Sequence, residues 1–343
     1  MKALVLKEYR RFAVEDVAVP ALRPDEVLVR VGACGICGSD VHGMDGSTGR
    51  RIPPLIMGHE AAGEITEVGA NVTGWQAGDR VTFDSTIYCG ECWFCRRGKV
   101  NLCENRQVLG VSCGDYRRHG AFAEFVAVPE RVLYWLPDNV TFQQGAMTEA
   151  VSVALHAVKR TPLASDAVAH VVGAGMIGLL VIQALRATGC PRVIAVDVDE
   201  SRLAKALQLG ATHALSANDP KLAAKILDLT EGRGADASFE VVGLPATVFA
   251  AIAATRKGGS VTLVGNLKPQ VDLPLQAVVT REITLFGSCA SAGEYPACLD
   301  LIATGKINVT DFISATAPLA EGAAWFDRLY AGEKGLMKVL LTP

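Results

Sequence analysis

The segment Val168-Ala-His-Val-Val-Gly-Ala-Gly-Met-Ile-Gly178 decides the fold of the C-terminal half of the chain. Its apolar start is typical of a buried strand, and the Leu- and Ala-rich residues after it are typical of a helix. A G-x-G-x-x-G sequence between a strand and a helix indicates a dinucleotide-binding turn. Gly173 permits the tight turn, Gly175 lets a pyrophosphate approach the backbone, and Gly178 lets helix and strand pack closely.

The residues around this turn complete a predicted nucleotide site. Met176 and Ile177 open the helix, whose N-terminal N–H groups attract phosphates. Asp197 follows nineteen residues after the last glycine, where a carboxylate binds the ribose hydroxyls and repels a 2′-phosphate, which predicts NAD over NADP. Arg202 weakens this preference, because an arginine can face a 2′-phosphate. We also expect cofactor contacts from the end of a later strand, at Val264, Gly265 and Asn266.

From about residue 151, short Val- and Ile-rich runs alternate with longer Ala- and Leu-rich stretches, as in βαβ units. This rhythm predicts an α/β fold with a doubly wound, six-stranded parallel sheet of the Rossmann type. A helix is expected over 176–188, since Gly189 and Pro191 end it. The six strands are predicted at 168–172, 193–197, 213–216, 237–242, 260–264 and 283–287.

Residues 1–150 have a different composition, rich in Gly and Pro. They contain short runs in which apolar and polar residues alternate, such as 26–31, 63–68 and 80–83. That pattern predicts a mostly antiparallel β-barrel. We therefore expect a first domain over 1–150 and a nucleotide-binding domain over 151–287. Residues 288–343, with a helix near 296–303 and a strand over 337–341, are expected to return to the first domain.

Composition excludes several classes of partner. The 343 residues carry a net charge of −3 with no basic stripe, so we expect no nucleic-acid partner. No apolar run approaches the roughly 20 residues that span a bilayer, so we expect no membrane partner. The N-terminus lacks the apolar core of a secretory signal, which predicts a cytoplasmic protein. Its ten cysteines should then be reduced, and clustered ones should be metal ligands.

Four cysteines form such a cluster in the stretch C-G-E-C-W-F-C-R-R-G-K-V-N-L-C: Cys89, Cys92, Cys95 and Cys103. Four thiolates can close tetrahedrally around one zinc ion. Because this set leaves no open coordination position, we expect it to be structural. A zinc-ribbon nucleic-acid binder is an alternative from the lobe alone, but the negative net charge and the nucleotide fold disfavour it.

A second potential metal site lies upstream, at Cys37, His59 and Glu60. A thiolate, an imidazole and a carboxylate are all zinc ligands, and three-ligand sets belong to sites with an open position. The sequence thus predicts a catalytic zinc in addition to the structural one. A histidine alone is more often a packed structural residue, but here it stands beside two other donors.

With these motifs in the right order over the whole length, the chain resembles the zinc-dependent medium-chain dehydrogenase/reductase superfamily, in the pattern of its sorbitol and galactitol-phosphate dehydrogenases. The resemblance implies a GroES-like catalytic domain, two zinc ions per chain, NAD, and a homodimer or homotetramer. It implies reversible oxidation of a secondary alcohol, a polyol or polyol phosphate, to a ketone. The motifs that carry it are Cys37-Gly-Ser-Asp-Val-His42, Gly58-His-Glu60, Gly120-Ala-Phe-Ala-Glu124, the four-Cys lobe and the glycine turn.

The resemblance also implies roles for single residues. Cys37 and His59 would bind the catalytic zinc, and Asp40 would orient His59. Ser39 would hydrogen-bond the substrate hydroxyl, and His42 would pass its proton onward through the cofactor ribose.

The third ligand of the catalytic zinc is left open by the sequence. In many alcohol dehydrogenases a cysteine stands near the start of the nucleotide domain, but here the matching segment carries Glu149. In the polyol pattern Glu60, Glu149, or both with water between them complete the zinc site.

The substrate is also left open. Segment 288–295 lacks the arginine of sorbitol-type enzymes, which disfavours sorbitol itself. Arg50 and Arg51 could hold a substrate phosphate bidentately, or they could be solvated loop charges. A threonine-type amino-alcohol dehydrogenase is the alternative enzyme. A non-catalytic relative is disfavoured because the catalytic residues are all present.

Overall fold

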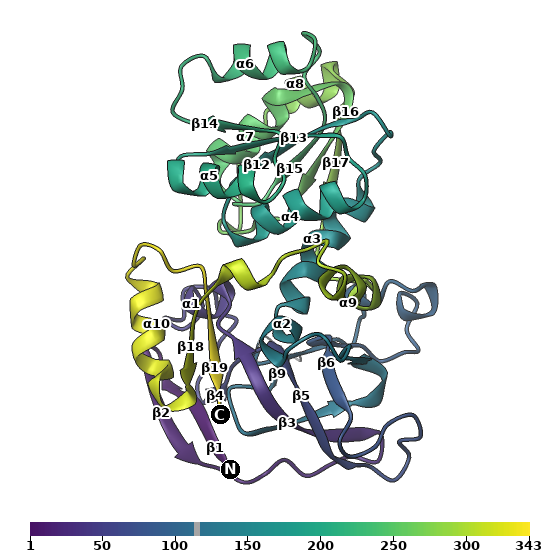
Figure 1. Cartoon of the computed structure of the whole chain (residues 1–343), viewed down its shortest axis with the longest axis vertical. Helices are drawn as coiled ribbons and strands as arrows, with labels where there is room; N and C mark the ends of the chain where they lie inside the picture. The colour runs from purple at the N-terminus through teal and green to yellow at the C-terminus, as the bar shows by residue number, and fades with distance from the viewer. Residues whose placement is uncertain (113–116) are drawn as a thin grey trace. The chain divides into compact units, whose positions relative to one another are not determined.

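The computed structural model describes residues 1–112 and 117–343, which divide into two compact units (Figure 1). The first unit comprises Met1–Glu149, Tyr295–Ala303 and Val309–Pro343. The second unit comprises Ala150–Glu294 and Thr304–Asn308. The predicted fold class is confirmed, since a mainly antiparallel unit and a parallel-sheet unit are both present.

The second unit is built on a six-stranded parallel sheet with the order β14-β13-β12-β15-β16-β17. β12 is first in the chain but central in the sheet, so the strand order reverses beside it. In open α/β sheets, ligands bind at the carboxyl ends of the strands at such a reversal. The strands are β12 (Val168–Val172), β13 (Arg192–Asp197), β14 (His213–Ser216), β15 (Ala235–Glu240), β16 (Thr255–Leu263) and β17 (Thr284–Gly287).

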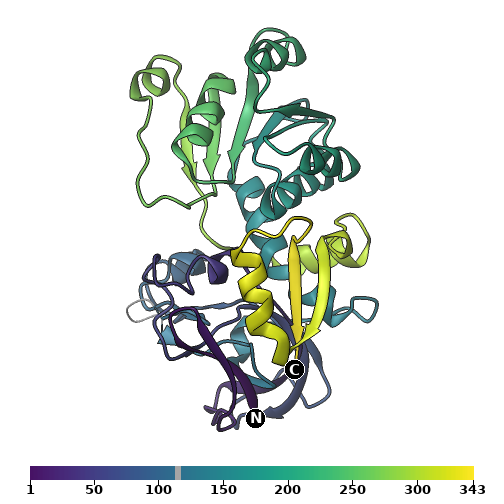
Figure 2. The same ribbon diagram turned by 90° about the vertical axis from the view of Figure 1, so that its left-hand side faces the viewer.

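Helices cover both faces of this sheet (Figures 1 and 2). Contacts join α4 to α5 and join α7 to both α6 and α8. All five residues of β12 are buried, which is why that strand is an unbroken apolar run apart from one histidine. The helices are α3 (Thr148–Arg160), which begins in the first unit, α4 (Met176–Ala187), α5 (Glu200–Gln208), α6 (Leu222–Leu229), α7 (Pro245–Ala254) and α8 (Leu275–Thr280).

The first unit contains a larger sheet with the order β11-β6-β5-β3-β19-β18, in which β10 also pairs with β3. Its pairs are antiparallel except for β18 with β19. Two three-stranded sheets, β2-β1-β4 and β7-β8-β9, complete the unit. The strands of the larger sheet are β3 (Glu26–Gly35), β5 (Glu60–Val68), β6 (Arg80–Phe83), β10 (Phe125–Pro129), β11 (Leu133–Trp135), β18 (Ile313–Pro318) and β19 (Lys338–Thr342).

The remaining elements of the first unit are short. None of the helices in the described part of the chain is long and apolar enough to cross a bilayer. The remaining elements are β1 (Lys2–Glu8), β2 (Arg11–Asp16), β4 (Leu55–Ile56), β7 (Thr86–Ile87), β8 (Gln107–Leu109), β9 (Arg117–Arg118), α1 (Gly38–Val41), α2 (Phe142–Ala146), α9 (Tyr295–Ala303) and α10 (Gly322–Tyr330).

The C-terminal strand β19 is central to the larger sheet. It pairs with the end of β3, where Leu340 lies opposite Gly35 and Leu341 opposite Cys34. The last residues of the chain therefore lie against the strand that leads into Cys37. This pairing brings the two ends of the sequence into one core, in which Phe122 and Phe326 pack edge to face.

His170 is an unusual residue for the centre of a parallel sheet. It lies on β12, is buried, and has its Nδ1 atom 3.2 Å from Ser238 Oγ. Its Nε2 atom has no hydrogen-bond partner among the described residues. Burial lowers the pKa of His170 to about 4, from an ordinary value of 6.5.

We predict that His170 makes the second unit sensitive to acid. Above pH 6.5 the imidazole is neutral in both states, but between pH 6.5 and about 4 only the unfolded chain binds the proton. The loss of stability should approach roughly 3 kcal/mol near pH 4. His170→Leu, which cannot bind a proton, should remove this loss. Urea midpoints from pH 7.5 to 4.5 test this, and parallel pH curves for the two proteins would contradict it.

Candidate metal and nucleotide sites

The four predicted lobe cysteines lie together in the first unit, within a loop that contains two short 3₁₀ turns. Ligand atoms from Cys89, Cys92, Cys95 and Cys103 all lie within 4.8 Å of one another. The Sγ atoms of Cys92 and Cys95 are 3.4 Å apart, and those of Cys89 and Cys95 are 4.0 Å apart. Four sulfurs bound to one zinc at about 2.3 Å would be about 3.8 Å apart, so the spacing fits a tetrahedral site.

The ionisation of these thiols also fits a cation. Backbone N–H groups of Glu104 and Cys95 lower the pKa of Cys92 to about 6. Burial and the neighbouring cysteine sulfurs raise the pKa of Cys95 to about 12. A thiolate pair at this separation repels itself, so a divalent cation is what would hold all four groups as thiolates.

The second predicted metal group is also assembled in the first unit. Ligand atoms from Cys37, His59 and Glu60 lie within 4.8 Å of one another. Cys37 caps helix α1, and its Sγ atom accepts hydrogen bonds from the backbone N–H and the hydroxyl of Ser39, at 3.4 and 3.3 Å. Gly58 has φ +96°, and a Cβ there would lie 2.8 Å from Cys34 Sγ. Only glycine therefore permits the turn that presents His59 and Glu60.

Asp40 lies behind His59, with its Oδ2 atom 3.4 Å from the imidazole Nδ1. Asp40 is fully buried. Burial alone would raise the pKa of Asp40, but the charges of His59 and Arg51 outweigh it and hold that pKa well below its usual range. Asp40 and Cys37 outweigh burial in the same way and raise the pKa of His59. The imidazole Nδ1 therefore faces a carboxylate at ion-pair distance, although the contact does not have the geometry of a hydrogen bond among the described residues. A carboxylate in this place is a common partner of a ligating histidine.

Glu60 is held by a residue that was not among the predicted site residues. Lys338, on β19, is buried and places its Nζ atom 2.5 Å from Glu60 Oε2. Glu60 and Cys37 raise the pKa of this lysine against the effect of burial. Glu60 Oε1, in contrast, is buried without a hydrogen-bond partner among the described residues. Such an atom beside a thiolate and an imidazole fits a metal ligand.

Glu149 lies outside the group whose ligand atoms are all within 4.8 Å. It is still close enough to His59 and Glu60 for their charges to act on it. Burial raises the pKa of Glu149 to about 7, and the negative charge of Glu60 adds to this rise. Of the two candidate carboxylates, the structure therefore groups Glu60 with Cys37 and His59.

The interpretation of Arg51 as a ligand for a substrate phosphate is wrong. Arg51 is buried, and its guanidinium bonds to Asp40 and Ser39 and not to solvent. Arg50 is exposed. Ser39 and His42, the two predicted members of the proton path, lie on or next to α1 and are both exposed.

The predicted dinucleotide turn joins β12 to α4 in the second unit. Gly173 has φ +100°, and a Cβ on Gly178 would lie 1.8 Å from Gly173 O. Gly175 caps α4, and a Cβ there would meet no atom within 4 Å. Helix α4 begins with Met176 and Ile177, directly after Gly175. The open space beside Gly175 therefore lies at the N-terminus of the helix, where a pyrophosphate would fit.

Asp197 ends β13 next to this turn. Its Oδ2 atom accepts a hydrogen bond of 2.6 Å from the backbone N–H of Ala174, so the carboxylate is fixed against the glycine turn. Arg202 Nη1 lies 4.0 Å from the same oxygen. Val264 and Gly265 follow β16 and donate their N–H groups to Glu240 O, and Asn266 comes next in the chain. These residues all follow carboxyl ends of strands in the sheet.

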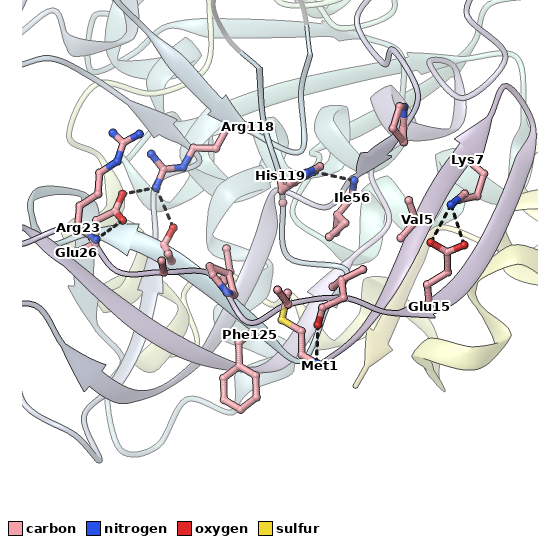
Figure 3. A pocket seen from close by; sticks show the side chains of 18 residues that line it. Met1, Val5, Lys7, Glu15, Arg23, Glu26, Ile56, Arg118, His119 and Phe125 are labelled. Atoms are coloured by element: carbon pink, nitrogen blue, oxygen red, sulfur yellow. Dashed lines mark hydrogen bonds and ion pairs between the residues drawn. The ribbon is translucent and has the colours of Figure 1, made fainter.

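A cavity of about 520 Å³ lies elsewhere in the first unit (Figure 3). Val5, Ile56 and Phe125 give it an apolar lining, and Glu26 pairs with Arg118 at one side. None of the predicted metal or catalytic residues lines this cavity. It is therefore separate from the candidate metal groups.

Two family models match the chain and cover both units. Residues 23–138 match the model described as "Alcohol dehydrogenase GroES-like domain", and residues 177–304 match "Zinc-binding dehydrogenase". The chain is 32% identical to the sorbitol dehydrogenase of Bacillus subtilis (strain 168) over 348 residues, which cover 100% of this chain and 97% of the relative. The chain belongs to the zinc-dependent medium-chain dehydrogenase/reductase superfamily.

Two further relatives of this dehydrogenase bear on its chemistry. It is 37% identical to the L-idonate 5-dehydrogenase of Vitis vinifera over 308 residues, which cover 88% of this chain and 83% of the relative. A solved structure from Sinorhizobium meliloti 1021, described as a zinc-binding dehydrogenase bound to NADP, superposes with a TM-score of 0.91. That structure is 31% identical and covers 100% of this chain and 99% of its own.

We predict that the two metal groups of this dehydrogenase can be emptied independently. His59→Ala removes an imidazole from one group and should leave one zinc ion per chain, with no turnover. Cys103→Ser removes a thiolate from the other group and should leave the zinc at His59. Elemental analysis of purified protein measures both. Two zinc ions and full turnover in His59→Ala would contradict the assignment of that group.

Proposed function

We propose that the chain is a zinc- and NAD-dependent dehydrogenase that reversibly oxidises a secondary alcohol of a polyol or polyol phosphate to a ketone. The observation that carries this proposal is the grouping of Cys37, His59 and Glu60 in a chain that also contains a dinucleotide turn. The sorbitol and L-idonate dehydrogenases among its relatives support a polyol-like substrate. The threonine-type alternative is not favoured by these relatives.

The chain's own residues supply binding and proton transfer. Cys37, His59 and Glu60 would hold the catalytic zinc. The chemistry supplied at this site would be polarisation of the alcohol oxygen by bound zinc, which lowers the pKa of the hydroxyl, and acceptance of a hydride by bound nicotinamide. Ser39 is exposed beside Cys37, so its hydroxyl could accept the alcohol proton while it gives its own proton to the next group in the path. His42, one turn further along at the end of α1, would pass the proton on.

We propose Glu60 as the third ligand and Glu149 as a nearby carboxylate that acts through water. Glu60 Oε1 lies with the other donors and lacks a hydrogen-bond partner in the described residues. Burial raises the pKa of Glu149 to about 7 when no metal ion is bound. A carboxyl group can hydrogen-bond a water molecule as an acceptor when it is ionised, and also as a donor when it is protonated.

We propose NAD as the preferred cofactor and two zinc ions per chain. Asp197 supports NAD, because its buried carboxylate is fixed at the end of β13 and would oppose a 2′-phosphate. Two observations favour NADP instead: a relative of known structure is bound to NADP, and Arg202 lies near Asp197. A homodimer or homotetramer and a cytoplasmic location stay predictions from the sequence.

The substrate class can be tested by reduction of NAD⁺ followed at 340 nm. The panel contains free and phosphorylated hexitols and pentitols, butanediol and threonine, each with NAD⁺ and with NADP⁺. We expect turnover of at least one polyol with NAD⁺, and its loss in His59→Ala. A kcat/KM for threonine above that for every polyol would overturn the polyol assignment.

The cofactor preference depends on Asp197. We predict that Asp197→Ala lowers the ratio of kcat/KM for NAD⁺ to that for NADP⁺ by about 10-fold or more, the effect of losing roughly 1.5–3 kcal/mol in hydrogen bonds to a charged group. Arg202→Ala is the matched control, since it removes the nearby cation and should raise the ratio. Steady-state kinetics with both cofactors measures the change, and an unaltered ratio in Asp197→Ala would count against the proposal.

A further inference from the structure

Arg51 is a buried cation for which the proposed reaction has no use. Its side chain is 4% exposed, whereas the neighbouring Arg50 is exposed. Arginine is seldom buried unless it is paired and its donors are satisfied. A cation in such a place, next to the candidate metal group, requires an explanation from its contacts.

The guanidinium of Arg51 contacts two side chains of helix α1. Nε and Nη2 donate to Asp40 Oδ1 at 3.0 and 2.8 Å, and Nη2 also lies 3.2 Å from Ser39 Oγ. Nη1 donates to the backbone oxygen of Arg50 at 3.3 Å. The stem packs on Gly43, where a Cβ would lie 2.7 Å from Arg51 Cγ. The arginine is thus held in one orientation, with its fork toward α1.

Each of these two partners contacts a candidate metal ligand. Asp40 uses its other oxygen, Oδ2, for His59 Nδ1 at 3.4 Å and for the backbone N–H of Cys37, also at 3.4 Å. Ser39 Oγ lies 3.3 Å from Cys37 Sγ. The guanidinium of Arg51 is therefore linked to His59 through Asp40 and to Cys37 through Ser39.

We propose that Arg51 is a positioning residue for the metal site and for the proton path. Through Asp40 it fixes the orientation of the His59 imidazole. Through Ser39 it donates a hydrogen bond to the hydroxyl oxygen and holds that oxygen beside Cys37 Sγ, with a lone pair left available to a substrate. This inference rests on the proposed function, because it takes Cys37 and His59 as metal ligands.

A lysine cannot reproduce these contacts. Arginine presents several N–H donors in a rigid plane, whereas the lysine ammonium is a point charge on a flexible stem. Arg51→Lys keeps a positive charge near Asp40 but cannot hold Asp40 and Ser39 with the same fork. Arg51→Gln removes the charge as well, and Arg50→Gln removes an exposed charge one residue away.

The experiment titrates the zinc-loaded protein and these three variants with a chromogenic chelator and records the release of each zinc ion. We expect two zinc ions in the wild type. In Arg51→Gln one zinc ion should be released with about 10- to 100-fold lower affinity, the usual cost of losing a partner of a metal ligand. The four-Cys zinc should be unchanged. Arg50→Gln should keep both wild-type affinities, and Arg51→Lys should lie between.

Kinetics and cobalt spectra separate positioning from general stability. For Arg51→Gln we expect kcat to fall by about 10-fold or more with a smaller change in KM. After exchange of the labile zinc for Co²⁺, the absorption bands of the bound cobalt should shift in Arg51→Gln and not in Arg50→Gln. A change in fold stability alone would move neither the bands nor the ratio of kcat to KM.

Unchanged zinc affinity, cobalt bands and kcat in Arg51→Gln would overturn the inference while the proposed function stands. A wild type that binds no zinc ion at Cys37 and His59 would overturn both. If Arg51→Gln does not fold, the same measurements on Arg51→Lys test the inference. Zinc affinity and kcat below the wild-type values support the role, and wild-type values overturn it.

Discussion

Compensation of buried charge is the constraint on which the metal-bearing unit depends. Asp40 and Glu60 are buried carboxylates, and moving either from water without a partner costs several kcal/mol. Arg51 and Lys338 supply the two buried cations. Lys338 comes from the last strand, 278 residues after Glu60. The pairing of β19 with β3 therefore has two effects. It buries apolar side chains, and it brings Lys338 to Glu60, which would otherwise be a buried charge without a partner.

The nucleotide turn and the four-Cys lobe could be predicted because their information is local. Gly173, Gly175 and Gly178 fall within six consecutive positions where one strand leads into one helix, and the structure has both elements where the pattern indicates them. The four cysteines lie within fifteen residues, so a short loop is enough to bring them together. The βαβ rhythm is likewise read from neighbouring segments. In each case the chain needs no distant partner to specify the contact.

The surroundings of Cys37 could be predicted only in part. The resemblance to a known family indicates the ligand types, but Lys338 stands in a strand pattern with nothing to mark it as the partner of Glu60. Arg51 was misread because a sequence shows a charge and not its burial, and Arg50-Arg51 within a Gly- and Ser-rich loop resembles a solvated or anion-binding pair. Its contacts with Asp40 depend on how residues 43–51 fold back over α1, a tertiary event without a local signature.

The charge balance also explains why these residues suit a divalent cation. With Cys37 as a thiolate, Asp40 and Glu60 make three anions against the two cations Arg51 and Lys338, and Glu149 adds a fourth anion when ionised. Without a metal ion, protons relieve part of this imbalance: the charges of Asp40 and Cys37 raise the pKa of His59, and burial together with the charge of Glu60 raises the pKa of Glu149. A divalent cation would balance all four anions with a neutral His59. Metal binding would therefore release protons from His59 and Glu149, leaving Glu149 ionised to accept a hydrogen bond from water at the site.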